Sequence, residues 1–302
     1  MTAGIKDNIL IEYTGNADEV SVPKGVKEIG ESAFLGCTQL KNAEISETVE
    51  KIGRMAFFKC EGLNRIDIPK NVSYIDETAF WRCEKLEDIR VDVDNDSYCD
   101  IDGVLFSKDK KTLILYPCGK DADTYVVPKD VERIADRAFC FSQKLKRVVF
   151  QNNVIAIGDY AFEQCVNLEN IKLPDSLKSM GEYIFDGCVK IKAVHIPENV
   201  EYIKLGTFSA CENLERITAD EKNKYFCDIE GVLLSRDKRG IICYPCGRKD
   251  ERYEVPKDVK MITRFAFANN KYIKEVSLSS DTEKIEQNAF FGCDKKLKVT
   301  YR

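Results

Sequence analysis

Residues 49–69 have the sequence VEKIGRMAFFKCEGLNRIDIP, and this stretch decides the fold. Its end, Ile66–Pro69, alternates apolar and polar side chains, which predicts a short strand that stops at the proline. The segment Ala56–Leu63 spaces apolar residues three apart, which predicts a single turn of α- or 3₁₀-helix. The part around Val49 and Ile52 is expected to be extended. Such a small unit cannot bury its own apolar side chains, so several copies must stack.

The stretch recurs along the whole chain. Its phenylalanine returns with one constant spacing, that from Phe34 to Phe57, at all but two of the intervals. The two longer intervals equal each other, so two units carry an insert of the same length, at residues 92–127 and 220–255. A period of this size is typical of a solenoid. The nine repeat phenylalanines are Phe34, Phe57, Phe80, Phe139, Phe162, Phe185, Phe208, Phe267 and Phe290.

A block of four repeats and one insert is itself duplicated, so that the block beginning around Phe34 returns around Phe162. Residues 98–105 of the first insert, for example, match residues 226–233 of the second. Within the first insert, the runs Gly103–Ser107 and Thr112–Tyr116 flank the charged segment Lys108–Lys111, which predicts a β-hairpin. We expect the basic tips of both hairpins to project from the solenoid.

The prediction for the whole chain is a β-rich α/β repeat solenoid of nine 23-residue units with two 36-residue β-hairpin inserts. Residues 1–302 would form a single solenoid domain, with residues 1–22 as its N-terminal cap and residues 294–302 as its C-terminal end. The segment 9–23 resembles the second half of an insert. Terminal units of a solenoid are expected to be atypical because one of their faces meets water.

Composition excludes several classes of function. The 302 residues include 46 Lys and Arg against 51 Asp and Glu, a net charge of −5, which argues against nucleic acid as a partner. The only histidine is His195, so His-dependent triads and multi-His metal centres cannot form within one chain. No apolar run approaches the length of a membrane helix. The segment Met1–Tyr13 lacks the pattern of a signal peptide, so the sequence as written reads as cytoplasmic.

The thirteen cysteines divide into two groups. Seven stand three residues after a repeat phenylalanine, which predicts a column of buried thiols that donate weak hydrogen bonds to neighbouring carbonyl groups. The other six lie in or near the inserts. Among them, Cys243 and Cys246 have the spacing of a redox or zinc pair, but the first insert has Leu115 in place of the first thiol, so a structural role is favoured. So many unpaired thiols favour a reducing or anaerobic setting.

Other motifs point away from catalysis and metal binding. Asp92–Asp96 begins like a calcium loop, but Ser97 and Gly103 stand where such a loop needs its glycine and its bidentate glutamate. The second copy carries Lys222 and Lys224 instead of carboxylates. No phosphate-binding, dinucleotide-binding or nucleophile-elbow motif occurs. We therefore expect no catalytic site, no metal and no cofactor.

The repeat resembles the 23-residue leucine-rich repeat of the BspA-like bacterial proteins, and the insert is similar to one interleaved in that family. The resemblance extends over nine units from Val20 to Val299. It implies a repeat solenoid that binds other proteins or host components without catalysis, at the bacterial surface or in secreted form. Departures from the pattern are confined to Ile184 and Thr207 before the phenylalanine, Ser142 and Asn270 at the cysteine position, and one extra residue in the last unit.

The strand of each unit exposes one face. Leu and Ile of the motif point inward, so the residues that flank the first Ile point outward and line one continuous strip. The strip carries both charges, and Arg pairs well with carboxylates and aromatic rings, which favours a protein partner over a polyanion. The candidate binding residues on it are Arg65, Asp67, Asp88, Arg90, Arg147, Lys172, His195 and Arg216.

We expect a non-catalytic binding or scaffold protein that presents this strip to a protein or other macromolecular partner. Three alternatives remain open at this point. The strip's charges could be the ordinary polar surface of an exposed sheet, with the chain acting as a structural spacer. The hairpin tips at Lys108–Lys111 and Arg236–Arg239 could be the binding site instead. An enzyme with an unrecognised site is the remaining alternative.

Overall fold

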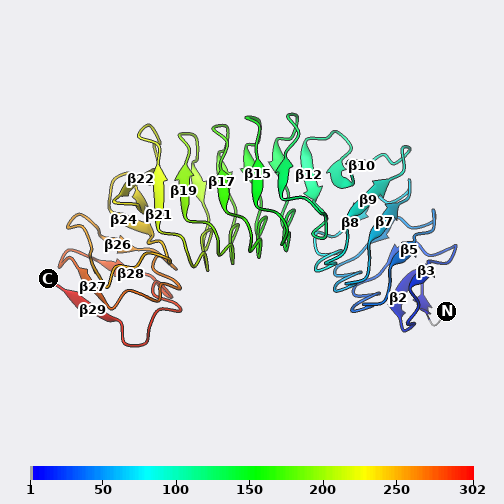
Figure 1. Ribbon diagram of the computed structural model, residues 1–302, viewed down its shortest axis with the longest axis horizontal. Coiled ribbons are helices and arrows are strands. Elements are labelled where there is room, and N and C mark those ends of the chain that lie inside the picture. The colour runs from blue at the N-terminus through cyan, green and yellow to red at the C-terminus, as the bar shows by residue number, and fades with distance from the viewer. Residues whose placement is uncertain (1–2) are drawn as a thin grey trace. The chain divides into compact units, whose positions relative to one another are not determined.

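The computed structural model describes residues 3–302, which form a β-solenoid of about 13 turns. Each solenoid turn contributes one strand to a first row, built from the Ile-x-Ile motif, and one strand, most often of two residues, to a second row (Figure 1). The chain divides into two compact units. Unit 1 contains residues 3–122 and 130–144, and unit 2 contains residues 123–129 and 145–302.

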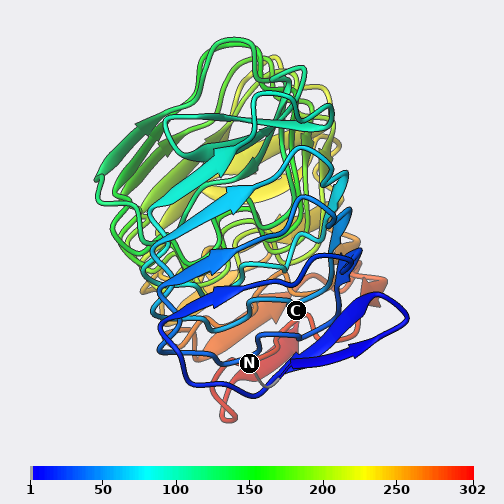
Figure 2. The ribbon, with the colours of Figure 1, turned by 90° about the vertical axis from the view of Figure 1, so that its right-hand side faces the viewer.

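The first row consists of parallel strands whose Ile residues point into the core. In Figure 2 the strands of this row in unit 1, coloured blue to cyan, lie side by side. In unit 1 the row contains β3 (Glu19–Ser21), β5 (Asn42–Glu44), β7 (Arg65–Ile68) and β9 (Asp88–Val91), paired in that order. In unit 2 it contains β13 (Thr124–Val126), β15 (Arg147–Val149), β17 (Asn170–Lys172), β19 (Ala193–Ile196), β21 (Arg216–Ala219), β25 (Arg252–Glu254), β27 (Glu275–Leu278) and β29 (Lys298–Tyr301).

The second row runs through the V-x-x-I part of each repeat. In unit 1 it contains β2 (Ile9–Tyr13), β4 (Glu28–Ile29), β6 (Lys51–Ile52), β8 (Tyr74–Ile75), β12 (Thr112–Leu115) and β14 (Arg133–Ile134). In unit 2 it contains β16 (Ala156–Ile157), β18 (Ser179–Met180), β20 (Tyr202–Ile203), β24 (Gly240–Cys243), β26 (Met261–Ile262) and β28 (Lys284–Ile285). Most strands of both rows place at least one apolar residue in the core or at its edge, and Ile52 and Ile66 are fully buried there.

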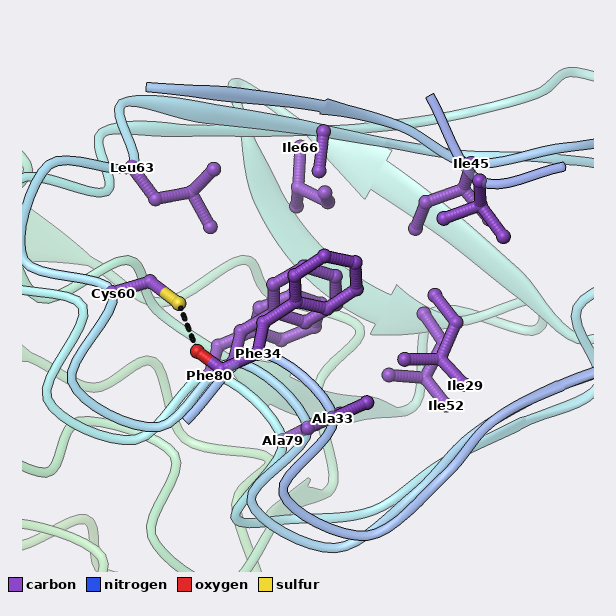
Figure 3. Close-up of a cluster of buried hydrophobic side chains, with 14 of the residues drawn as sticks. Ile29, Ala33, Phe34, Ile45, Ile52, Cys60, Leu63, Ile66, Ala79 and Phe80 are labelled. Carbon is purple, nitrogen blue, oxygen red and sulfur yellow. Dashed lines mark hydrogen bonds between the residues drawn. The ribbon is translucent and has the colours of Figure 1, made fainter. Parts of the chain in front are cut away.

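The phenylalanine column predicted from the repeat is confirmed. The ring of Phe57 stacks between Phe34 and Phe80 at centroid distances of 4.8 and 5.3 Å, and all three are buried (Figure 3). Unit 2 repeats the arrangement, with Phe185 stacked between Phe162 and Phe208 at 5.7 and 5.9 Å. Adjacent solenoid turns therefore pack these phenylalanine rings against one another in the core.

The α/β class and the helical turn are wrong. Residues 3–302 contain no helix, because in most repeats the residue before the Ala-Phe pair and the residue before the cysteine position adopt a left-handed backbone, as Met55 and Lys59 do at φ values of 52° and 59°. Alternate amides also bond outward: the Phe57 N–H donates to the Ala79 carbonyl of the next solenoid turn, at 2.8 Å. A helix needs consecutive amides bonded within the segment. The segment is instead a chain of β-turns.

The predicted count of nine units is also too low, because each insert supplies a solenoid turn of its own. Tyr116 stacks on Phe139 at 5.1 Å and Tyr244 on Phe267 at 4.9 Å, so the two tyrosines extend the phenylalanine column. The predicted hairpins are confirmed and gain a third antiparallel strand. They comprise β10 (Tyr98–Ile101), β11 (Val104–Ser107) and β12 in the first insert, and β22 (Phe226–Ile229), β23 (Val232–Ser235) and β24 in the second.

The N-terminal segment resembles the second half of an insert, as predicted. Strand β2 pairs antiparallel with β1 (Ala3–Lys6) and parallel with β4. Strand β12 has the same two relations to β11 and β14. Residues 1 and 2 of the predicted cap lie outside the described residues. That the two units form one continuous domain stays a prediction.

The thiol column is built as predicted, with donors aimed at carbonyl groups. The Cys60 thiol donates to the Phe34 carbonyl at 3.1 Å (Figure 3), and Cys83 donates to Phe57 at the same distance. At the two ends of the column the burial differs from the prediction, since Cys37 and Cys293 are only half-buried. Among residues 3–302 no two cysteines form a disulfide bond.

Candidate functional site

The eight predicted strip residues all lie on first-row strands and point away from the core. Ile66 and Ile89 of neighbouring strands are fully buried, so the residues beside them face outward. Six of the eight side chains are exposed, whereas Arg65 and Asp88 are half-buried. The structure therefore brings these residues together in two groups, one in each unit.

In unit 1 the strip neutralises its own charge. The Arg65 guanidinium donates to the Asp67 carboxylate on the same strand at 2.5 Å, and the Arg90 Nε donates to Asp88 at 2.8 Å. The register sets Arg65 opposite Asp88 and Asp67 opposite Arg90, so each charge also meets its opposite across the strands. The hydrogen bond that Arg65 donates to the Asp67 carboxylate raises the pKa of Arg65. These four residues satisfy one another and leave little charge for a partner.

In unit 2 the strip is cationic. Among the described residues, none forms an ion pair with Arg147, Lys172 or Arg216. His195 shares a hydrogen bond of 3.0 Å between its Nδ1 and the Thr218 hydroxyl, and no acidic residue occupies a strip position from β15 to β21. From β15 to β21 the unit 2 strip therefore has positive charges that no other strip residue balances.

The unpaired cations border a hollow with apolar side chains at its edge. A depression of about 360 Å³ lies over β15 and β17, and Arg147, Val149, Phe150 and Lys172 line it. Val126 of β13 is paired directly beside Val149, and these two valines are 50% and 39% exposed. We call this surface the cationic patch; it comprises Val126, Arg147, Val149, Phe150 and Lys172.

Sequence reasoning missed Val126, because the segment that carries it was assigned to the end of an insert. The sequence did contain a signal for a first-row strand at this place. Residues 124–128 read Thr-Tyr-Val-Val-Pro, which has the apolar spacing and the closing proline of the I-x-I-P strand. The structure places them on β13, in the first row beside β15.

The hairpin tips are exposed, but their basic residues are partly used to hold the inserts together. The Lys108 ammonium donates to the carbonyl oxygens of Val93, at 3.1 Å, and Asn95. Arg236 donates to the Glu221 carbonyl at 2.8 Å in the second copy. These two side chains therefore fold back onto the loop that precedes each hairpin.

The two motifs set aside in the sequence have structural roles. Asn95 of the calcium-like loop is fully buried, and its amide donates to the Pro69 and Val72 carbonyls at 2.9 Å. The Cys246 thiol donates to the Cys211 carbonyl at 2.8 Å and so continues the thiol column, while burial raises its pKa to about 12. Residues 3–302 contain no cluster of three or more His, Cys, Asp or Glu side chains arranged to hold a metal ion.

Stacked parallel strands with one inward Leu, Ile and Phe column per turn define a leucine-rich repeat solenoid. The chain belongs to the family with the BspA type leucine rich repeat region, whose model matches six copies over residues 5–111, 116–229 and 244–301. No curated protein matches the chain. In the described residues there is no helix that could cross a membrane.

Solved structures of bacterial leucine-rich repeat proteins share the fold. A leucine rich cell surface protein from Faecalibacterium prausnitzii is 27% identical with a TM-score of 0.62, over 86% of this chain and 59% of its own. A leucine-rich repeat protein from Eubacterium ventriosum is 22% identical with a TM-score of 0.64, over 94% and 88%. The pneumococcal vaccine antigen PcpA is 22% identical with a TM-score of 0.61, over 94% and 62%. This chain thus spans about three fifths of the length of the first and third proteins.

Proposed function

We propose that the chain is a non-catalytic binding module whose cationic patch captures an acidic segment of a protein partner. The observation that carries this proposal is the contrast between the two strips. In unit 1 the four candidate charges Arg65, Asp67, Asp88 and Arg90 pair with one another, whereas Arg147 and Lys172 of unit 2 have no ion-pair partner among the described residues. Unbalanced charge on a rigid surface is available to a ligand.

The chemistry of the patch favours a peptide with carboxylates around an apolar residue. The Arg147 guanidinium can pair with a carboxylate through two parallel hydrogen bonds, which Lys172 cannot do. Val126 and Val149 present apolar surface that a partner's side chain would cover. Binding energy concentrates on a few central residues of this kind, with Arg strongly represented.

The relatives support a location as well as a role. The Faecalibacterium structure belongs to a cell surface protein, and this chain shares 27% identity with it. The proposal therefore includes a location: the module acts at a bacterial surface. There it binds another protein, which can be a protein of a host. A repeat scaffold of this kind needs no catalytic group for such a role.

Charge reversal at the centre of the patch tests the proposal. Arg147→Glu should weaken binding of a synthetic peptide of alternating Glu and Val by about tenfold or more, measured by calorimetry at low salt, because attraction becomes repulsion. Its melting temperature should stay close to that of the unchanged protein, since the residue is exposed. The matched control is Arg90→Glu, the same substitution on the unit 1 strip, which should leave peptide binding unchanged.

Two outcomes would count against the proposal. Equal losses in Arg147→Glu and Arg90→Glu would show that only overall charge matters. Full binding by Arg147→Glu, with loss when Lys110 and Lys238 at the exposed hairpin tips are both changed to Ser, would transfer the site to the inserts.

A further inference from the structure

The two copies of the duplicated block differ at one position in a way that leaves a cavity in the second copy. Trp81 directly follows Phe80, and Ser209 directly follows the equivalent Phe208, so the two residues occupy the same place in the repeat. We infer that the cavity beside Ser209 is a binding site for a planar aromatic ring of about the size of an indole. None of its lining residues belongs to the strip, so the inference goes beyond the proposed function.

In the first copy, the equivalent space is filled by the protein itself. The Trp81 ring lies 5.2 Å from the Phe58 ring and 6.0 Å from the Phe141 ring, and the Arg137 guanidinium lies over it at 5.3 Å. Arg82 lies over the Phe141 ring at 4.9 Å. Only about 10 Å³ of free space remains among these side chains. The fold therefore accommodates an indole at this position of the repeat.

In the second copy the wall is kept and the indole is missing. The walls of both spaces include the same positions, with Phe208, Cys246 and Ala268 in place of Phe80, Cys118 and Cys140. Ser209 replaces the indole, and the free volume is about 200 Å³. An engineered apolar cavity of about 150 Å³ in another protein binds benzene, so this volume suffices for a small aromatic ring.

The aromatic neighbours of the first copy are replaced by groups that hold the cavity open. Asp186 and Asn269 occupy the positions that Phe58 and Phe141 have in the first copy. Both are hydrogen-bonded to Ser209, and the Asn269 amide donates to the Ser209 hydroxyl at 3.2 Å. Because Ser209 satisfies the hydrogen-bonding groups of the other two side chains, the three polar side chains stay together and do not pack onto the apolar wall. The space that the Trp81 indole fills in the first copy thus stays empty in the second copy.

A second aromatic group forms a fixed side of the cavity. Phe265 replaces Arg137, and its ring meets the Tyr183 and Phe291 rings edge-on at 6.2 and 6.0 Å. The Arg264 guanidinium lies over the same ring at 4.9 Å. An incoming aromatic ring can pack against Phe265, and such pairs contribute about 0.5–1.5 kcal/mol beyond the area they bury. These contacts identify the ligand class as a planar aromatic ring.

Titration with free indole, followed by ¹H–¹⁵N NMR and calorimetry, tests the inference. The unchanged protein should bind one indole saturably, with shifts concentrated at the amides of residues 205–209 and 263–268. Ser209→Trp fills the space as Trp81 does and should weaken binding at least tenfold.

The matched control is Leu35→Trp, which adds an indole at the same repeat position on an exposed surface. It should bind indole like the unchanged protein. If Ser209→Trp does not fold, as judged by its melting curve, Ala268→Leu narrows the same cavity from another wall and should have the same effect. Absence of saturable binding, or equal binding by the protein with a filled cavity, overturns the inference.

The same titration distinguishes two sources of the ring. A free aromatic metabolite would be bound as indole itself, whereas a partner's side chain would be bound better within a peptide. We therefore compare indole with a short peptide that has one central Trp. Tighter binding of the peptide points to a protein partner, and tighter binding of indole points to a small molecule; either result supports the ring site.

Discussion

A buried asparagine closes one solenoid turn at a position where the thiol column is interrupted. Asn270 occupies a cysteine position, and its amide donates to the Pro245 carbonyl at 3.2 Å and the Arg248 carbonyl at 2.9 Å. Its carbonyl oxygen accepts hydrogen bonds from the amides of Tyr272 and Ile273. A thiol has one weak donor, so the asparagine satisfies more backbone groups in the same space. This departure from the repeat strengthens the turn locally.

Asp186 should make stability depend on pH. Burial raises the pKa of its carboxyl group above the ordinary value of 3.8, and a hydrogen bond from Ser209 partly opposes that rise. The folded protein therefore holds this proton more tightly than the unfolded chain does. The resulting stability is complete below pH 3.8 and is lost as the pH rises through the folded pKa.

Asp186→Asn is accordingly expected to raise the melting temperature at pH 7 by a few degrees, because asparagine is neutral and can still accept the Ser209 hydrogen bond. The gain should shrink as the pH falls towards 3.8. Calorimetric melting of both proteins at several pH values measures it, with the exposed Glu198→Gln as control. A lower melting temperature for Asp186→Asn at pH 7 would contradict the assignment.

The burial and direction of a side chain were predictable from the sequence where the residue recurs at the same position of the repeat. The burial of Phe57 and the direction of the Cys60 thiol follow from a position that recurs with the period. The cavity beside Ser209 did not follow, because a serine in place of a tryptophan indicates nothing until its neighbours are known. Its walls come from four segments that only the fold brings together.

At the scale of elements, spacing alone could not separate a helical turn from a series of β-turns. Both place apolar residues three apart on one side. The deciding feature is the left-handed backbone at residues such as Phe141 and Tyr160, with φ values of 61° and 58°. Non-glycine residues seldom adopt it, so the sequence gives little warning. Bonds to the neighbouring solenoid turn compensate for the strained geometry.

The phenylalanine column should stabilise each turn according to its number of neighbours. Phe57→Ala removes a buried ring with a stacked ring on both sides and is expected to cost about 3–5 kcal/mol of unfolding free energy. Phe290 is half-buried and stacks on Phe267, so Phe290→Ala should cost about half as much or less. Urea unfolding followed by circular dichroism measures both. Equal costs would show that neighbouring turns do not determine the contribution.

The inserts were predictable as hairpins but not as solenoid turns. Their charged tip and flanking apolar runs are local signals, which sequence patterns record well. The role of Tyr116 and Tyr244 in the core column depends on where the strand after the hairpin rejoins the stack. That position is set by the parallel pairing of β12 with β14 and of β24 with β26.

At the scale of the molecule, duplication has produced two copies with the same core and different surfaces. The buried Phe80 and Phe208 are equivalent, whereas the neighbouring Trp81 and Ser209 have diverged. Core positions are held by contacts with both adjacent turns, so change there is costly. Surface positions on a repeat can vary one at a time. Both the cationic patch and the proposed ring site lie in unit 2.

Stacking in one dimension also determines how the protein should open. Within unit 2, the amide of Phe185 donates to the Thr207 carbonyl at 3.0 Å, and the amide of Lys298 donates to the Lys274 carbonyl at 2.9 Å. The two hydrogen bonds are alike in length, so their strength does not distinguish them. An inner solenoid turn opens only by losing contacts with two neighbours, whereas β29, whose residues are all exposed, has one paired neighbour, β27.

Hydrogen exchange measured by NMR should therefore be at least about a hundredfold slower for the Phe185 amide than for the Lys298 amide, since each 1.4 kcal/mol of opening free energy is about tenfold in rate. The amides of Phe162 and Phe185, on adjacent inner turns, serve as the control and should exchange within about tenfold of each other. Similar rates for Phe185 and Lys298 would mean that the unit opens all at once, and the free energy of a turn would then not depend on its place in the stack.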